Sequence, residues 1–273
     1  MPKILINMAG KKKKKSKTGN KSLFKRILLI TGKILLAIFL LSILLPLSYR
    51  WINPPVTPLM VIRKISDKAP IEKKWMDIDQ ISPHMISCAI AAEDNNFLGH
   101  RGFDWGAIQK AINERESGKR KRGASTISQQ TAKNVFLWPN QSWVRKGLET
   151  YFTFLIELFW SKERIMEVYL NVIEMGNGIY GAEAAARHYF KKPAKDLTLK
   201  QSALITAAYP DPRHRNPANP SAYLRNQSDR ITALTRKIGK IGFDPVSIKK
   251  ARERYKAREA ERRKKNDGKL LNI

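Results

Sequence analysis

A nearly continuous apolar run close to the amino terminus constrains this chain more than any other feature. From Ile27 to Leu47 the sequence reads ILLITGKILLAIFLLSILLPL, 21 residues in which Lys33 is the only charge. A helix needs about 20 apolar residues to cross the hydrocarbon core of a bilayer. Lys33 lies near enough to the basic flank for its long side chain to reach the headgroups. The run therefore predicts one transmembrane helix.

A cleaved signal peptide is the alternative interpretation of this run. Cleavage needs a small-x-small site after the apolar stretch, but residues 47–51 are the bulky sequence LSYRW. We therefore expect an uncleaved, single-pass anchor.

Basic residues before the run set its expected orientation. Residues 1–26 hold ten Lys and Arg and no acid, and the positive-inside rule places such a flank in the cytoplasm. The chain is thus expected in the cytoplasmic (inner) membrane, with the rest of the protein on the periplasmic or extracytoplasmic side. Cys88 is the only cysteine, which excludes an intrachain disulfide and a cysteine-rich zinc module.

The formal charge of +29 would, on a soluble protein, first suggest nucleic acid as a partner. However, 42% of the residues are hydrophobic, so a folded core is expected. Residues 1–26 and 249–265 together supply +17 of the charge. A nucleic-acid interpretation would depend on these tails, and we expect no nucleic acid as a partner.

The remainder divides into three expected parts. Prolines 54, 55 and 58 predict an extended stalk over residues 48–80. Residues 81–220 predict one compact domain, and residues 221–273 a basic helical extension whose far end is a solvated helix. Helical periodicity covers residues 82–92, 104–116, 127–137, 143–160, 162–173, 180–189 and 198–208. Alternating strand patterns are scarce, so the predicted class is all-α (mainly helical).

Glu93 and Asp94 end the first of these helices. A carboxylate at the carboxyl end of a helix feels the negative pole of the helix dipole, which raises its pKa toward the range useful for proton transfer. Glu93 is therefore a candidate general base. The alternative is that both residues are solvated charges at a helix end.

A second candidate begins at the glycine turn of the sequence RGASTISQQ, residues 122–130. Thr126 and Gln129 have the spacing of a capping box. Gln130, Lys133 and Asn134 then share one helix face, so amides and a cation lie near a helix amino end, which suits a diphosphate. The alternative is an ordinary capped surface helix.

A third candidate is Arg145 with Glu149 at i and i+4 and Lys146 beside them. On spacing alone, a surface ion pair that leads into a core helix is the simpler interpretation. The apolar run YFTFLIELFW, residues 151–160, follows. We expect it in the core, with a membrane-facing patch as the alternative.

Taken together, these strings resemble the biosynthetic peptidoglycan glycosyltransferases, which include the monofunctional membrane transglycosylases and the polymerising module of class A penicillin-binding proteins. The resemblance covers about residues 80–220, and what remains has no room for a transpeptidase domain, as in the monofunctional form. The matching residues, in family order, are Glu93, Asp94, Phe97, His100 and Gly102; Gly123, Ser125, Thr126, Ile127, Gln129, Gln130, Lys133 and Asn134; Arg145, Lys146 and Glu149; and Lys162, Ile165, Glu167, Tyr169, Leu170 and Asn171.

This resemblance implies a lysozyme-like, mainly helical fold and the polymerisation of lipid II into β-1,4 glycan strands, with release of polyprenyl diphosphate and inversion from α to β. Glu93 would be the general base and Glu149 a second catalytic acid. Lys133, Arg145 and Lys146 would stabilise charge on the departing diphosphate. The implied substrate-binding residues are Asp94, His100, Ser125, Gln130, Lys133, Arg145 and Lys146.

The role of Glu149 stays open between orienting the basic residues and helping to hold a divalent cation, Mg²⁺ or Mn²⁺, at the diphosphate. No cofactor is predicted as an absolute requirement. The expected partners are lipid II, the nascent glycan strand, membrane lipids and other cell-wall synthases. Residues 209–212 read Tyr-Pro-Asp-Pro where the family usually has leucine-proline-asparagine-proline, which leaves local donor-site contacts open.

Two other functions compete with this one. A hydrolase could use Glu93 as a general acid on finished glycan, but it has no need for a diphosphate cluster, so Lys133, Arg145 and Lys146 favour synthesis. A membrane-tethered binder of anionic polymers would act through its tails. Deletion of residues 249–273 is expected to abolish such binding and to spare an enzyme.

Overall fold

The computed structural model describes residues 18–118, 123–140 and 142–270, and it divides into two compact units, residues 1–45 and 46–273. Most of helix α1 (Thr18–Ser48) belongs to the first unit. Its stretch Leu23–Ser48 is long and apolar enough to cross a membrane, and the 18-residue window that meets this test has no buried residue. This agrees with the expected membrane helix. The lysine block at residues 11–15 lies outside the described residues, so the orientation stays a prediction.

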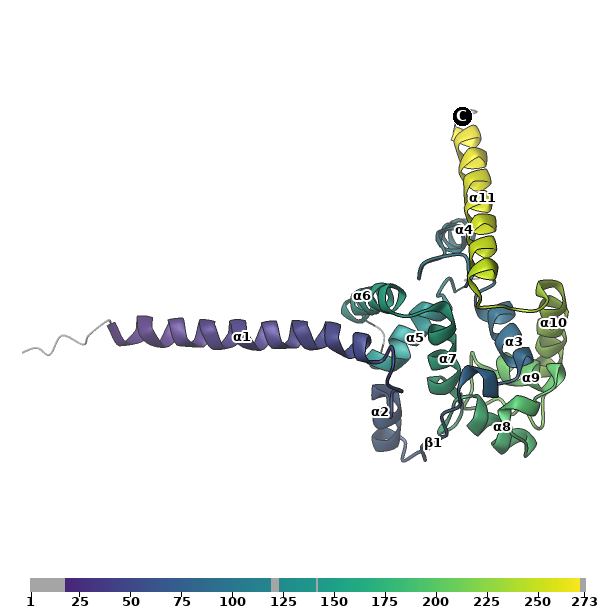
Figure 1. Ribbon diagram of the computed structural model, residues 1–273, viewed down its shortest axis with the longest axis horizontal. Coiled ribbons are helices and arrows are strands. Elements are labelled where there is room, and N and C mark those ends of the chain that lie inside the picture. Colours follow the sequence, from purple (N-terminus) through teal and green to yellow (C-terminus); the bar gives the residue numbers. More distant parts are fainter. Residues whose placement is uncertain (1–17, 119–122, 141, 271–273) are drawn as a thin grey trace, which may run out of the picture. The chain divides into compact units, whose positions relative to one another are not determined.

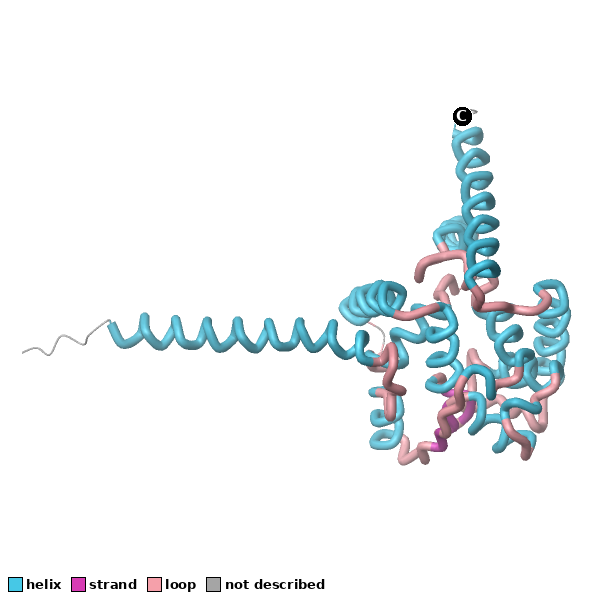
Figure 2. The backbone as a smooth tube through the Cα atoms, in the orientation of Figure 1, coloured by secondary structure: helices cyan, strands magenta, loops and turns pink. Residues whose placement is uncertain are grey.

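The second unit is mainly helical, as expected (Figures 1 and 2). Its described strands are only two or three residues long. Its elements are α2 (Pro58–Ser66), β1 (Glu72–Lys73), η1 (Ile78–Gln80), α3 (Pro83–Glu93), α4 (Trp105–Glu116), α5 (Ile127–Phe136), α6 (Trp143–Phe159), α7 (Lys162–Val172), β2 (Glu174–Gly176), β3 (Ile179–Tyr180), α8 (Ala182–Phe190), η2 (Ala194–Asp196), α9 (Leu199–Ala208), α10 (Ala222–Ile238) and α11 (Pro245–Leu270). The strand order is β1-β3-β2, with β1 parallel and β2 antiparallel to β3.

Side-chain caps fix where the helices around the site begin. Ser82 caps α3, with Pro83 at the first helical position, and Thr126 and Gln129 form the expected capping box of α5. Ser142 and Ser161 accept backbone N–H bonds at the starts of α6 and α7. Each cap satisfies backbone donors that the first turn leaves unpaired.

Helix α7 lies in the centre of the core. Its Ile165, Met166, Val168, Tyr169 and Leu170 are wholly buried. Helix α5 packs against both α6 and α7, and α3 packs against α9 and α10. Helices α5 and α6, which carry most of the site candidates, are thus packed against each other and against the core.

A buried polar cluster joins α5, α6 and α7. Ser128 Oγ donates to Glu157 Oε1 at 2.5 Å, and Lys162 Nζ donates to the same oxygen at 2.6 Å. The Lys162 ammonium also lies 4.6 Å from the ring centre of Phe97. Burial lowers the pKa of Lys162, and Glu157 opposes this effect. The pairing compensates a charge that would otherwise be costly to bury.

The segment expected as a stalk, residues 48–80, folds onto the domain instead of extending away from it. Pro58 occupies the first turn of α2, where proline costs no hydrogen bond, and α2 buries Met60 in the core. Trp160 Nε1 donates to the Pro46 carbonyl at 2.7 Å, and Arg164 donates to the carbonyls of Tyr49 and Ile52. Pro58 therefore starts a packed helix.

The carboxyl-terminal extension also packs on the domain. Helix α10 packs against α3 and α9, and one side of α11 packs against the loop that follows α3. A Cβ atom added to Gly99 would lie 2.6 Å from the Cβ of Tyr255, and the Tyr255 hydroxyl accepts a bond from Trp105 N at 3.2 Å. Most described side chains of α11 are exposed, as expected for a solvated helix, but Ala251 and Tyr255 in its first half contact the domain.

Candidate active site

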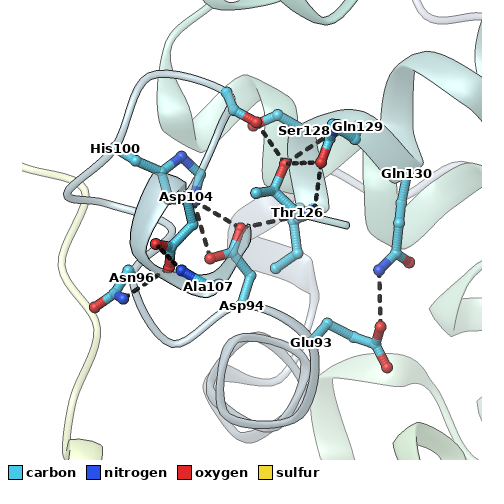
Figure 3. Close-up of polar contacts among 12 residues, drawn as sticks. Glu93, Asp94, Asn96, His100, Asp104, Ala107, Thr126, Ser128, Gln129 and Gln130 are labelled. Carbon is cyan, nitrogen blue, oxygen red and sulfur yellow. Dashed lines mark hydrogen bonds and ion pairs between the residues drawn. The ribbon is translucent and has the colours of Figure 1, made fainter. Parts of the chain in front are cut away.

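Glu93 is the last residue of α3, and its carboxylate points toward α5 (Figure 3). Oε2 accepts a hydrogen bond from Gln130 Nε2 at 2.7 Å. Burial raises the pKa of Glu93, and the neighbouring Asp94 raises it further, while Gln130 and Lys133 oppose the shift. The direction matches the sequence-based expectation, but the main cause is burial and not the helix dipole. The raised pKa makes Glu93 a better proton acceptor than an ordinary exposed carboxylate.

Asp94 and His100 form a buried pair behind Glu93. Both carboxylate oxygens of Asp94 lie 2.9 Å from His100 Nε2, and Oδ2 also accepts from Ile127 N at 3.0 Å. Through these contacts Asp94 connects His100, in the loop after α3, to the amino end of α5. His100 is only 2% exposed, and its ring packs edge-on against Phe97 and Tyr255. This geometry suits His100 to a positioning role and does not suit it to direct substrate contact.

Gln130 links α3, α5 and α7. While its Nε2 bonds to Glu93, its Oε1 accepts from the Tyr169 hydroxyl at 3.1 Å. One helical turn later, Lys133 is half-buried on the same face. Burial lowers the pKa of Lys133; Glu149 and Glu93 raise it, and Arg145 and Lys146 lower it. Lys133, Glu93, Arg145, Lys146 and Glu149 therefore lie close enough to affect one another electrostatically.

The first turns of α6 bring two cations onto one acid. Arg145 NH1 donates to Glu149 Oε2 at 3.0 Å, and Lys146 Nζ donates to Oε1 at 2.5 Å. Glu149 is 3% exposed and Arg145 8%, whereas nearly half of the Lys146 side chain is exposed. Arg145 Nε is buried without a hydrogen-bond partner among the described residues. The pairing on Glu149 is a buried one, unlike the surface ion pair that spacing alone suggested.

Two cavities meet at the Glu93–Gln130 hydrogen bond. The first cavity, of about 220 Å³, has Gln130 and Lys133 in its wall, and the second, of about 240 Å³, has Glu93 in its wall. The first also includes Arg63, Asn134, Trp138, Tyr169, Glu174, Tyr209 and Pro212, and the second Asp94, Asn95, Asn96, Asp104, Lys110, Ser125, Thr126 and Arg262. The structure thus offers two cavities linked by the Gln130–Glu93 hydrogen bond, with Lys133 in the wall of the first and Glu93 in the wall of the second.

The residues of the site do not form a ready cage for a divalent cation. Both oxygens of Glu149 already accept bonds from cationic side chains. Among the described residues, no group of three His, Cys, Asp or Glu side chains gathers with a geometry that could hold a metal. Mg²⁺ prefers several oxygen ligands in an octahedral arrangement, which this donor set does not supply.

The structure brings together Glu93, Gln130, Lys133, Arg145, Lys146 and Glu149, and places Ser125 in the wall of the second cavity. Three residues in the cavity walls were not predicted from the sequence. Two come from segments outside the expected domain, and one had no assigned role. Arg63 comes from the segment taken as a stalk, Arg262 from the carboxyl-terminal helix, and Tyr209 was noted only as a departure from the family pattern. No local pattern marks these residues, because their positions depend on long-range packing.

Comparison with known proteins identifies close relatives. Residues 60–236 match the family model described as transglycosylase. A biosynthetic peptidoglycan transglycosylase of Bacteroides thetaiotaomicron is 54% identical over 230 residues, which cover 82% of this chain and 92% of that protein. Proteins of the same name from Rhodospirillum centenum and Caulobacter vibrioides are 48% and 51% identical, over 80% and 77% of this chain and 96% and 93% of theirs.

Proposed function

This chain belongs to the transglycosylase family, with the biosynthetic peptidoglycan transglycosylases, and we propose that its catalytic centre is the junction of the two cavities at Glu93. The protein is a peptidoglycan glycosyltransferase of cell-wall synthesis, and its reaction polymerises lipid II into glycan strands. The observation that supports the placement is the Gln130–Glu93 hydrogen bond, because it joins a residue of the first cavity to a carboxylate in the wall of the second.

The second cavity is proposed to hold the acceptor sugar. Its hydroxyl loses a proton to Glu93 as the oxygen attacks the anomeric carbon of the donor. Burial keeps the pKa of Glu93 raised, so the carboxylate takes up the proton readily. Gln130 holds Oε2 of that carboxylate, which leaves Oε1 for the acceptor hydroxyl. Ser125, exposed in the same cavity, is proposed as a contact to the sugar.

The first cavity is proposed to hold the donor, since Lys133 supplies positive charge to its wall, where Arg63 is paired with Glu174. As the new bond forms, the bond from the anomeric carbon to the diphosphate breaks, and the configuration inverts from α to β. The electron pair leaves with the diphosphate oxygen. Lys133, Arg145 and Lys146 are suited to stabilise this charge, and preorganised electrostatic stabilisation of this kind is commonly the largest single contribution to catalysis.

Glu149 is proposed to act by positioning Arg145 and Lys146. Its two oxygens hold one cation each, so both are fixed in direction before substrate arrives. Because those oxygens are engaged, the alternative in which Glu149 helps to hold a divalent ion finds no support in the donor set.

The catalytic unit is proposed to rest on the outer face of the cytoplasmic membrane, with α1 as a single-pass anchor and the amino terminus in the cytoplasm. One side of α6 supports this placement, because Trp143, Val144, Phe154 and Leu158 lie within one helical stripe and each is at least 60% exposed. We call these four residues the α6 stripe. Exposed apolar stripes of this kind mark protein or membrane contacts. Membrane lipids are therefore proposed partners, and other cell-wall synthases stay a prediction.

The test gives purified full-length protein in detergent a labelled lipid II, and compares it with the Glu93→Gln variant. Polymer from the wild type and none from the variant is the expected result. Finished peptidoglycan is offered in parallel. Cleavage of finished glycan with lipid II untouched would instead identify a hydrolase that uses Glu93 as an acid.

A further inference from the structure

A third cavity lies on the other side of the loop that follows Glu93, between α3, the end of α10 and α11. It has a volume of about 420 Å³, larger than either cavity of the active site. Its apolar wall includes Leu98, Ile238 and Ile241, and Tyr255 of α11 lines it as well. A volume of this size lies in the range of pockets that hold whole organic ligands and not single ions.

The charge of this cavity is one-sided. Its lining contains five exposed basic side chains and no acidic one; the five are Lys237, Lys240, Lys250, Arg254 and Arg258. None of them forms an ion pair with an acid among the described residues, whereas Arg262, one turn further along α11, pairs with Glu259. We call this cavity the basic groove. Unpaired cations around an apolar wall attract a ligand that carries carboxylates or phosphates.

The basic groove adjoins the active site. Asn95 and Asn96, directly after Glu93 and Asp94, line both the groove and the second cavity. Asn96 Oδ1 accepts from Arg258 at 3.3 Å, while its Nδ2 donates to Asp104 at 2.8 Å on the side of the second cavity. Only Asn95 and Asn96 therefore separate a sugar bound beside Glu93 from the cations of the groove. A charged branch on that sugar could extend across them into the groove.

We propose that the basic groove binds the carboxylate-bearing peptide of the peptidoglycan unit whose sugar lies in the second cavity. The inference rests on the proposed function, which places the acceptor beside Glu93. Lipid II is a disaccharide that carries a peptide, and such a peptide ends in at least one free carboxylate. The diphosphate is proposed to be recognised elsewhere, at Lys133, Arg145 and Lys146, so the peptide is the anionic part of the substrate that is left for this groove.

Two substrates and two matched variants of full-length protein test the proposal. The substrates are lipid II with its ordinary peptide and lipid II whose peptide carboxylates have been amidated. The groove variant, Lys250→Ala with Arg254→Ala, removes two cations that line the groove. The control variant, Lys249→Ala with Lys256→Ala, removes the same charge from exposed positions of the same helix that do not line it.

In detergent without anionic lipid, the wild type is expected to show a KM about fivefold lower for the ordinary substrate than for the amidated one, as a few solvent-exposed ion pairs would give. The groove variant should lose that preference through a higher KM for the ordinary substrate, with kcat unchanged. The control variant should keep it. A Tyr255→Phe variant with an intact preference would show that the charges, and not a shift of α11, carry the effect.

Several outcomes would overturn the proposal. Equal losses in the groove and control variants would mean a general attraction to basic protein. A loss seen only in vesicles that contain phosphatidylglycerol would assign the groove to lipid headgroups. An unchanged preference in the groove variant would mean that the peptide binds elsewhere. Failure of the wild type to polymerise either substrate would refute the proposed function itself, and this result is distinct from the other three.

Discussion

Gln130 donates from Nε2 to Glu93 at 2.7 Å while its Oε1 accepts from the hydroxyl of Tyr169. Tyr169 is wholly buried in the core, so its hydroxyl fixes which end of the amide faces the carboxylate. The result is a donor permanently directed at the proposed base. This donor lowers the pKa of Glu93 against the larger effect of burial.

Replacing Gln130 with Met is expected to move the acid limb of the kcat/KM profile to higher pH. Glu93 acts as a base only when it is deprotonated, and loss of a bond to the charged form raises its pKa. A higher pH is then needed to deprotonate it. Tyr169→Phe is the control, since it keeps the amide beside Glu93 and should shift the limb less. An acid limb that stays in place in Gln130→Met would contradict the role given to this contact.

Breaking the Arg145–Glu149 pair is expected to lower the free energy of unfolding far more than breaking a surface pair of the same spacing. Glu149→Ala leaves a buried guanidinium without its partner, which typically destabilises a protein by about 3 kcal/mol or more. Lys110 and Glu114 form an i, i+4 pair at 3.8 Å that is much more exposed than the pair on α6, and Glu114→Ala should cost less than about 1 kcal/mol. Thermal unfolding of both full-length variants in detergent measures the difference. Similar melting temperatures would show that burial does not strengthen the pair on α6.

The polymerisation rate of Glu149→Ala should also fall by more than the loss of folded protein explains. At a temperature where the variant is fully folded, kcat is expected to drop by roughly 10²-fold, in the range of losing a preorganised electrostatic contact, because Arg145 and Lys146 lose their common anchor. Normal kcat in the folded variant would mean that the diphosphate orients these cations unaided.

Helix α11 is expected to matter for catalysis, although it lies beyond the matched family region. Gly99→Ala adds a Cβ that would lie 2.6 Å from Tyr255, so α11 must move away from the loop that follows Glu93. We expect about a tenfold loss of kcat/KM, since small displacements near reacting groups are costly. Gly147→Ala is the control, because a Cβ there meets no atom within 4 Å. The sequence alone predicts that deletion of residues 249–273 spares an enzyme, but the contacts of Tyr255 with the loop after Glu93 change this expectation, and the deletion should impair polymerisation. Full activity of that truncation would show that the contact is incidental.

Local signals in the sequence predict most of the helices and much of the site. Ser82, Thr126 and Ser161 each start a helix where the pattern indicates, because a cap depends only on residues within one turn. The spacing of Gln130 and Lys133 likewise places both on one helix face. What such signals cannot give is burial, and burial is the main cause of the raised pKa of Glu93.

The errors concern segments whose position depends on distant partners. Arg164 binds carbonyls of Tyr49 and Ile52, more than 100 residues earlier, and Tyr255 packs on Gly99 from the far end of the chain. A proline-containing linker and a charged helix have the same local pattern whether or not such a partner exists. Because of these tertiary contacts, the segment expected as a stalk and the first half of α11 are parts of the folded unit.

The α6 stripe is expected to serve the reaction only at a membrane. Phe154→Ser with Leu158→Ser removes apolar surface worth about 1.5–3 kcal/mol per side chain when buried in an apolar environment. The KM for lipid II in vesicles should therefore rise about tenfold or more, with little change in detergent. Val246→Ser, which alters an exposed apolar residue of α11, is the control. Equal activity of the double variant in vesicles and in detergent would assign the stripe to something other than lipid.

Removal of divalent cations is expected to leave the substrate-free protein unchanged. Within the part of the chain that the structure describes, no three His, Cys, Asp or Glu side chains gather into a metal site, and both oxygens of Glu149 are engaged by Arg145 and Lys146. A ligand that binds only the folded state raises the melting temperature, so a resident ion would reveal itself by a fall in that temperature with EDTA. We expect the same melting temperature in Mg²⁺ and in EDTA at matched ionic strength. Any effect of Mg²⁺ should appear only once a polyprenyl diphosphate is added, since its phosphate oxygens would then supply the ligands that the protein lacks. A lower melting temperature with EDTA in the absence of that diphosphate would mean that carboxylates of this chain hold an ion by themselves, and the positioning role of Glu149 would have to be revised.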